Sequence, residues 1–122
     1  MKSKKRILIL DDEPIVCERL QPALEKVGFE VVSCTESQKA IDILAEQRFD
    51  VLVTDVKMSG PDGLEVLGFV HDTSPSTKVI VITGFATAET ARSAMKSGAV
   101  DFIAKPFKIN QLRDLILSVT KD

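Results

Sequence analysis

RILILDDE, residues 6–13, is the stretch that decides the fold. Four apolar residues, 7–10, follow one another without alternation and stop at three carboxylates. A strand with one solvated face alternates apolar and polar side chains, whereas a strand buried on both faces, as in a parallel sheet, is apolar throughout. The stretch therefore predicts a buried strand with acidic residues at its carboxyl end.

Five short runs rich in β-branched residues recur along the chain, and the segments between them have helical apolar spacing, as at Ile41 and Leu44 or at Leu112 and Ile116. The predicted strands are Arg6–Leu10, Glu30–Cys34, Val51–Thr54, Lys78–Thr83 and Asp101–Ala104. Strands that alternate with helices require right-handed crossovers, which place helices on both faces of a parallel sheet. We expect one doubly wound α/β domain.

The helix ends carry local signals. Gly28 and Gly98 stand where a left-handed C-terminal cap is expected, and Thr35 with Gln38 matches a capping box that would open the second helix. Pro22 lies inside the first helical pattern, where its missing amide should bend the helix.

Composition excludes several classes of function. The chain has 122 residues, enough for one domain. Its net charge of −2 gives no electrostatic attraction to nucleic acid or to an anionic membrane. No apolar run approaches the roughly 18 residues of a membrane span, and the basic start precedes only four apolar residues, so we expect neither an anchor nor a signal peptide.

Two cysteines, Cys17 and Cys34, have neither a CxxC spacing nor a His-rich neighbourhood. They are expected to be reduced thiols that serve as packing residues, in a cytoplasmic protein.

Polar side chains follow four of the predicted strands: the acidic run 11–13, then Asp55, then Thr83 with Gly84, then Lys105. Ligands of open parallel sheets bind outside the carboxyl ends of the strands. If Asp12 and Asp55 face each other about 5 Å apart, they repel by about 3 kcal/mol at an effective dielectric constant of 20. Such a pair needs a cation, and Mg²⁺ suits carboxylate ligands.

Each of these residues also has an ordinary interpretation. Asp11 or Asp12 could cap the helix that begins at Pro14, and Asp55 could belong to a turn. Lys105 alone could be a surface lysine, and Gly84 a simple turn glycine. Four strand ends that supply acids, a hydroxyl and an amine together favour a functional site.

From Arg6 to the last helix, this pattern resembles the receiver domains of bacterial two-component response regulators. The segment around residues 83–102 is similar to the nitrogen-regulatory, transcription-activator type. The resemblance implies a flavodoxin-like fold with strand order 2-1-3-4-5 and five helices. It also implies that residues 1–122 are one receiver domain.

The resemblance implies a Mg²⁺ site. Asp12 would be a direct ligand, and Asp11 would act largely through water. Asp55 and the main-chain carbonyl of Lys57 would complete the set.

The resemblance also implies that Asp55 accepts the phosphoryl group. Thr83 would donate a hydrogen bond to a phosphoryl oxygen, and Lys105 would pair with it. Phe102 would be the aromatic residue that reorients on activation, and the Lys105-Pro106 bond would be cis.

The implied partner is a sensor histidine kinase or phosphotransfer protein, with acetyl phosphate as a small alternative donor. The domain would catalyse its own phosphorylation and slow dephosphorylation, without being a metabolic enzyme. An output domain or a second copy would use the face of the fourth helix, fifth strand and fifth helix. Two positions depart from the family pattern: Ser59 replaces the usual proline, and Lys108 replaces an acidic residue before the last helix.

Three alternatives stay open. One is a receiver-like module that binds a partner without phosphorylation. The others are an aspartate-nucleophile phosphatase and a flavodoxin, but the chain lacks the Asp-x-Asp spacing of the first and a Gly-rich phosphate loop for the second. The sequence does not decide between a standalone regulator and a piece of a longer one.

Overall fold

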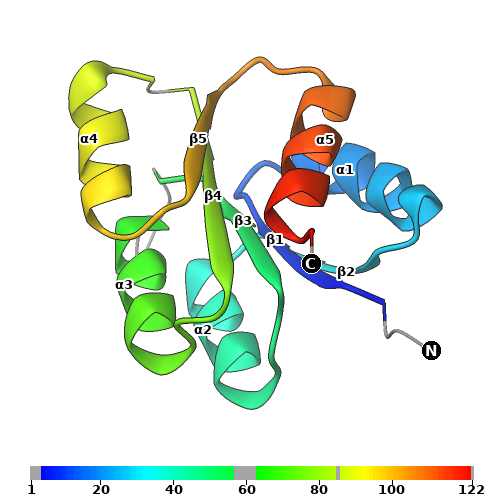
Figure 1. Cartoon of the computed structure of the whole chain (residues 1–122), viewed down its shortest axis with the longest axis horizontal. Coiled ribbons are helices and arrows are strands. Elements are labelled where there is room, and N and C mark those ends of the chain that lie inside the picture. The colour runs from blue at the N-terminus through cyan, green and yellow to red at the C-terminus, as the bar shows by residue number, and fades with distance from the viewer. Residues whose placement is uncertain (1–3, 57–62, 85, 122) are drawn as a thin grey trace.

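A computed structural model describes residues 4–56, 63–84 and 86–121. Within them, five strands alternate with five helices, as predicted (Figure 1). The strands are β1 (Arg6–Leu10), β2 (Glu30–Cys34), β3 (Val51–Thr54), β4 (Lys78–Thr83) and β5 (Asp101–Ala104). The helices are α1 (Pro14–Val27), α2 (Ser37–Glu46), α3 (Gly63–Thr73), α4 (Ala88–Lys96) and α5 (Ile109–Val119).

All strand pairs are parallel, and the strand order is β2-β1-β3-β4-β5. The register pairs Leu10 with Thr54, Thr54 with Val81, and Thr83 with Ala104. The carboxyl ends of β1, β3, β4 and β5 therefore meet at one edge of the sheet. The predicted doubly wound fold is confirmed.

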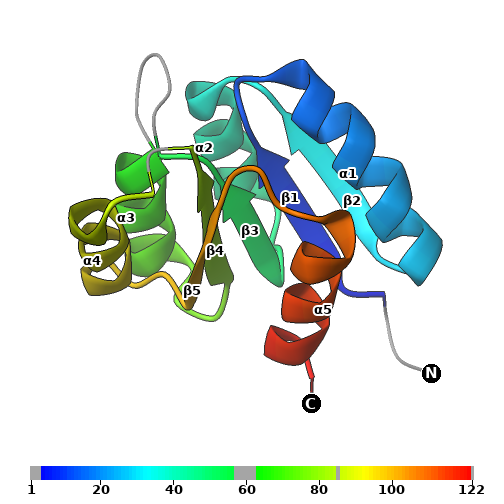
Figure 2. The ribbon, with the colours of Figure 1, turned by 90° about the horizontal axis from the view of Figure 1, so that it is seen from above.

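Helices cover both faces of the sheet. Figures 1 and 2 show α1 and α5 on one side and α2, α3 and α4 on the other. Successive residues of β1 supply the two cores: Ile7 and Ile9 pack with α1 and α5, and Leu8 and Leu10 with α2, α3 and α4. All four are fully buried, which explains the unbroken apolar run.

The helix ends agree only in part with the sequence signals. Gly28 and Gly98 have φ values of 114° and 111°, and these left-handed conformations confirm both predicted C-terminal caps. The capping box at Thr35 is wrong, because α2 begins at Ser37 and its N-cap residue is Glu36, whose side chain makes no capping hydrogen bond. Thr35 directly follows β2, so it lies too early to cap this helix.

Pro22 does not interrupt α1, which continues through it to Val27. Cys17 and Cys34 are unpaired and buried, in line with packing roles. Burial is the main cause that raises the pKa of both thiols, that of Cys34 to about 11. Across the described residues, no helix combines the length and apolar character needed to cross a membrane.

Candidate functional site

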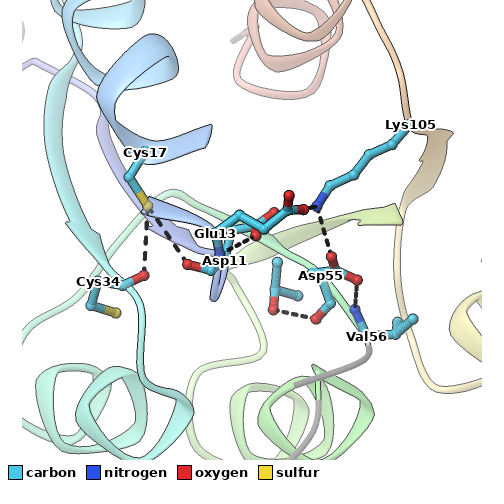
Figure 3. A network of polar contacts seen from close by, with 8 residues as sticks. Asp11, Glu13, Cys17, Cys34, Asp55, Val56 and Lys105 are labelled. Atoms are coloured by element: carbon cyan, nitrogen blue, oxygen red, sulfur yellow. Dashed lines mark hydrogen bonds and ion pairs between the residues drawn. The ribbon is translucent and has the colours of Figure 1, made fainter. Parts of the chain in front are cut away.

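Asp11 and Asp55 continue the β-ladder just beyond the strands. The amide of Asp55 donates a hydrogen bond to the carbonyl of Leu10 (3.1 Å). The amide of Asp11 donates one to the carbonyl of Cys34 (3.2 Å). Main-chain bonds thus fix both residues at the sheet edge, where Asp11 is 0% and Asp55 5% exposed. Two acidic side chains are buried side by side (Figure 3).

Lys105 compensates this buried charge. Its Nζ lies 2.7 Å from Asp11 Oδ2, 2.8 Å from Asp55 Oδ2 and 2.9 Å from Glu13 Oε1. Its amide donates to the carbonyl of Thr83 (2.8 Å), which anchors the start of this side chain at the end of β4. Burial alone would lower the pKa of Lys105, but hydrogen bonds to the three carboxylates outweigh it and raise the pKa above its usual range.

Burial still disfavours the charged form of Asp11 despite the contact with Lys105. Burial raises its pKa, and hydrogen bonds from Lys105 and from the amide of Glu13 offset that rise only in part. Its Oδ1 accepts the Glu13 amide (2.9 Å). Its buried Oδ2 lies 2.7 Å from Lys105 Nζ and has no other polar partner among the described residues. A second cation beside this oxygen would offset more of the cost of its burial.

The carboxylate of Asp55 has a defined orientation. Oδ1 accepts the amide of Val56 (2.6 Å), and Oδ2 accepts a hydrogen bond from Lys105 Nζ (2.8 Å). The main-chain carbonyl of Asp55 accepts the hydroxyl of Thr54 (2.8 Å).

The three aspartates fit a divalent metal. One carboxylate oxygen from each of Asp11, Asp12 and Asp55 lies within 4.8 Å of the others, and Asp12 is the exposed member. A set of three carboxylate oxygens, two of them on buried residues, suits Mg²⁺ or Ca²⁺. The predicted ligand Lys57 and the unusual Ser59 lie outside the described residues.

Thr83 and Phe102 have the placement expected of a coupled pair, although their roles stay predictions. Thr83 is fully buried at the end of β4. Val81, two residues earlier, shares its face of the sheet and pairs with Phe102 across the β4–β5 ladder. Phe102 is half-buried and packs against the core on the side of α2, α3 and α4.

The ordinary interpretation of the first acidic pair is wrong. Neither Asp11 nor Asp12 is the N-cap of α1, because that position belongs to Glu13, with Pro14 at the first helical position. Lys108 is the N-cap residue of α5 and makes no side-chain capping bond, as its chemistry predicts. The Lys105-Pro106 bond is cis, as the resemblance implied.

Two residues near the site escaped sequence reasoning. Glu13 contacts Lys105, a contact that its place in the acidic run could have suggested. Gly63 packs against the main chain of Asp55, and no local pattern indicates that approach.

Comparisons with known proteins agree with this geometry. The family model of the response regulator receiver domain matches residues 7–117 of this chain. The response regulator protein PilR of Pseudomonas aeruginosa is 32% identical over 119 residues, which cover 98% of this chain and 27% of PilR. The transcriptional regulatory protein ZraR of Escherichia coli K12 is 33% identical over 107 residues, which cover 88% of this chain and 24% of ZraR. The chain thus spans about a quarter of the length of these relatives.

Solved structures are similar over nearly the whole chain. A CheY-like receiver domain from Methanospirillum hungatei has a TM-score of 0.91 at 29% identity and covers 95% of this chain and 93% of its own. A receiver domain from Clostridium thermocellum has a TM-score of 0.87 at 31% identity, with coverage of 94% and 93%. The BeF3-activated DrrB receiver domain has a TM-score of 0.92 at 22% identity, with coverage of 98% and 100%, and supports the fold alone.

Proposed function

Because this chain belongs to the family of response regulator receiver domains, we propose that it accepts a phosphoryl group on Asp55 with the help of Mg²⁺ and Lys105. The observation that carries the proposal is the position of Lys105 Nζ, within 2.8 Å of Asp55 Oδ2 and 2.7 Å of Asp11 Oδ2. One ammonium group thus bridges the proposed acceptor and a proposed metal-site residue.

The chemistry follows from charge. A carboxylate that attacks an anionic phosphoryl group brings like charges together, so catalysis depends on positioning and on charge compensation. The carboxylate of Asp55 forms a bond to phosphorus, and the bond from phosphorus to the donor nitrogen or oxygen breaks. Imidazole of a phosphohistidine, or acetate from acetyl phosphate, leaves with the electron pair.

Asp11, Asp12 and Asp55 would hold Mg²⁺, which when bound neutralises charge on the phosphoryl oxygens. Lys105 then pairs with the same group, and Thr83 donates its hydroxyl to a phosphoryl oxygen. Water hydrolyses the resulting acyl phosphate and restores the carboxylate. The domain thus catalyses its own modification and reset.

The proposed partners follow from this chemistry. A sensor histidine kinase or a phosphotransfer protein supplies the phosphohistidine. The new phosphoryl group adds charge beside Thr83 and biases the face of α4, β5 and α5, which an output domain or a second copy would contact. By analogy with the transcriptional regulatory protein ZraR, the output is transcription. The unpaired cysteines fit a cytoplasmic location. We also propose that the receiver domain occupies residues 1–122.

Phosphorylation by a small donor tests the proposal without knowledge of the kinase. The chain is incubated with acetyl phosphate and Mg²⁺, and its intact mass is measured over time. The expected result is a single, acid-labile phosphoryl group that is absent in Asp55→Asn and present in the control Asp72→Asn, a change at an exposed α3 carboxylate. No incorporation in the folded wild-type chain would favour a module that binds without phosphorylation.

A further inference from the structure

Gly63, the first residue of α3, lies against the peptide that carries the Asp55 carboxylate. A Cβ at position 63 would stand 1.9 Å from the carbonyl oxygen of Asp55 and 2.7 Å from both the carbonyl carbon of Asp55 and Cα of Val56. Favourable contacts between carbon atoms occur at about 3.5–4.0 Å. Gly63 does not have a positive φ, so the requirement for glycine is one of space.

The three atoms nearest to such a Cβ all belong to the main chain. A flexible side chain could turn away from a new methyl group, but these atoms move only if the main chain at residues 55–56 shifts or α3 moves away from it. Gly63 is buried, and its amide donates to the carbonyl of Val56 (3.1 Å), which ties α3 to the end of β3. The close approach is therefore part of how the two elements join.

The Asp55 carbonyl is also held from a second direction. The hydroxyl of Thr54 donates to it at 2.8 Å, and Thr54 is fully buried. The same peptide unit, Asp55-Val56, supplies the amide that binds Asp55 Oδ1 at 2.6 Å. A shift or rotation of this peptide would thus change the orientation of the carboxylate whose other oxygen faces Lys105.

We propose that Gly63 and Thr54 are positioning residues for Asp55: together they fix its carbonyl, and through the Val56 amide they orient the carboxylate toward Lys105. Neither residue touches the reacting atoms. The inference rests on the proposed function for its kinetic consequence. A misplaced reacting group lowers the rate steeply, even when the change lies outside the chemistry.

Gly63→Ala tests the proposal, and Gly68→Ala is its matched control. Both changes add one methyl group to α3, but a Cβ at Gly68 meets no atom within 4 Å. Folding is checked by circular dichroism. The amide proton of Val56 is then followed by NMR in the metal-free protein, with Asp55→Ala as the reference for the lost acceptor. The rate of phosphorylation by acetyl phosphate with Mg²⁺ is the second readout.

Gly63→Ala should shift the Val56 amide proton toward its position in Asp55→Ala and slow phosphorylation by about tenfold or more. Gly68→Ala should leave both unchanged. Thr54→Val, which replaces the hydroxyl with a methyl group of similar size, should change both in the same direction as Gly63→Ala.

An unchanged Val56 signal or an unchanged rate in folded Gly63→Ala overturns the proposal, and so does an equal effect of Gly68→Ala. If Gly63→Ala does not fold, Thr54→Val decides by the same criteria. A wild-type chain that takes up no phosphate would refute the proposed function instead, and the Val56 signal would then decide alone whether these residues orient Asp55.

Discussion

Lys105 Nζ lies 2.8 Å from Asp55 Oδ2, although the two residues are 50 positions apart in the chain. The side chain of Lys105 is 15% exposed, so this ammonium group is largely withdrawn from water. Glu13 and Asp11 share the same group. Lys105 is thus the positive centre of an acidic site, and its charge should affect both metal binding and phosphorylation.

Replacement of Lys105 by methionine should leave the fold intact but slow phosphorylation of Asp55. The same change should strengthen Mg²⁺ binding by roughly tenfold, because removal of a positive charge from a cation site lowers electrostatic repulsion. Isothermal titration with Mg²⁺ measures this effect. Weaker Mg²⁺ binding in the folded variant would contradict the assigned charge balance.

Asp12→Ala should weaken Mg²⁺ binding without destabilising the chain. Asp12 is the exposed member of the three aspartates, so its loss should change the free energy of unfolding by no more than about 0.5 kcal/mol. Asp42→Ala, at an exposed acidic residue of α2, is the control. Equal Mg²⁺ affinities in the two variants would place the metal elsewhere.

Thr83→Ala should allow phosphorylation of Asp55 but weaken the structural change that phosphorylation causes at Phe102. Beryllofluoride, a stable substitute for the phosphoryl group, should shift backbone NMR signals of residues 83–98 and of Phe102 more than those of α2. In Thr83→Ala the shift at Phe102 should shrink while phosphorylation of Asp55 stays detectable. Uniform shifts throughout the domain would show that the signal leaves by another face.

The buried thiol of Cys34 should make the folded chain less stable in alkaline solution. Burial raises the pKa of this thiol from 9.0 to about 11, so between these values the folded chain binds more protons than the unfolded chain. The free energy of unfolding therefore falls as pH rises from about 9 to 11, by up to about 2 kcal/mol from this group. Denaturant unfolding of the wild type and of Cys34→Ala isolates the effect. The same pH slope in both proteins would assign the loss to other groups.

Much of this architecture follows from the apolar runs. All five strands begin and end at the predicted residues, and the unbroken apolar runs of β1, β3 and β4 each stop at polar side chains. Convergence of Asp11, Asp55 and Lys105 follows as well, because parallel strands bring their carboxyl ends to one edge of the sheet. Sequence reasoning thus predicts that these three side chains meet at the site.

Some details could not be predicted, because they depend on the path of the loops or on contacts between side chains that are far apart in the sequence. The start of α2 at Ser37 depends on how the chain leaves β2, and the residues that match a capping box do not decide it. The contact of Glu13 with Lys105 spans 92 positions. The need for glycine at Gly63 appears only once α3 folds back against Asp55.

The most direct test of the central claim is to locate the acyl phosphate chemically. The chain is phosphorylated with acetyl phosphate and Mg²⁺ and reduced with borohydride, which converts an aspartyl phosphate into homoserine, and its peptides are sequenced by mass spectrometry. Our account predicts homoserine at position 55 alone, and none in Asp55→Asn. Homoserine at another aspartate, or none in the folded wild-type chain, would contradict it.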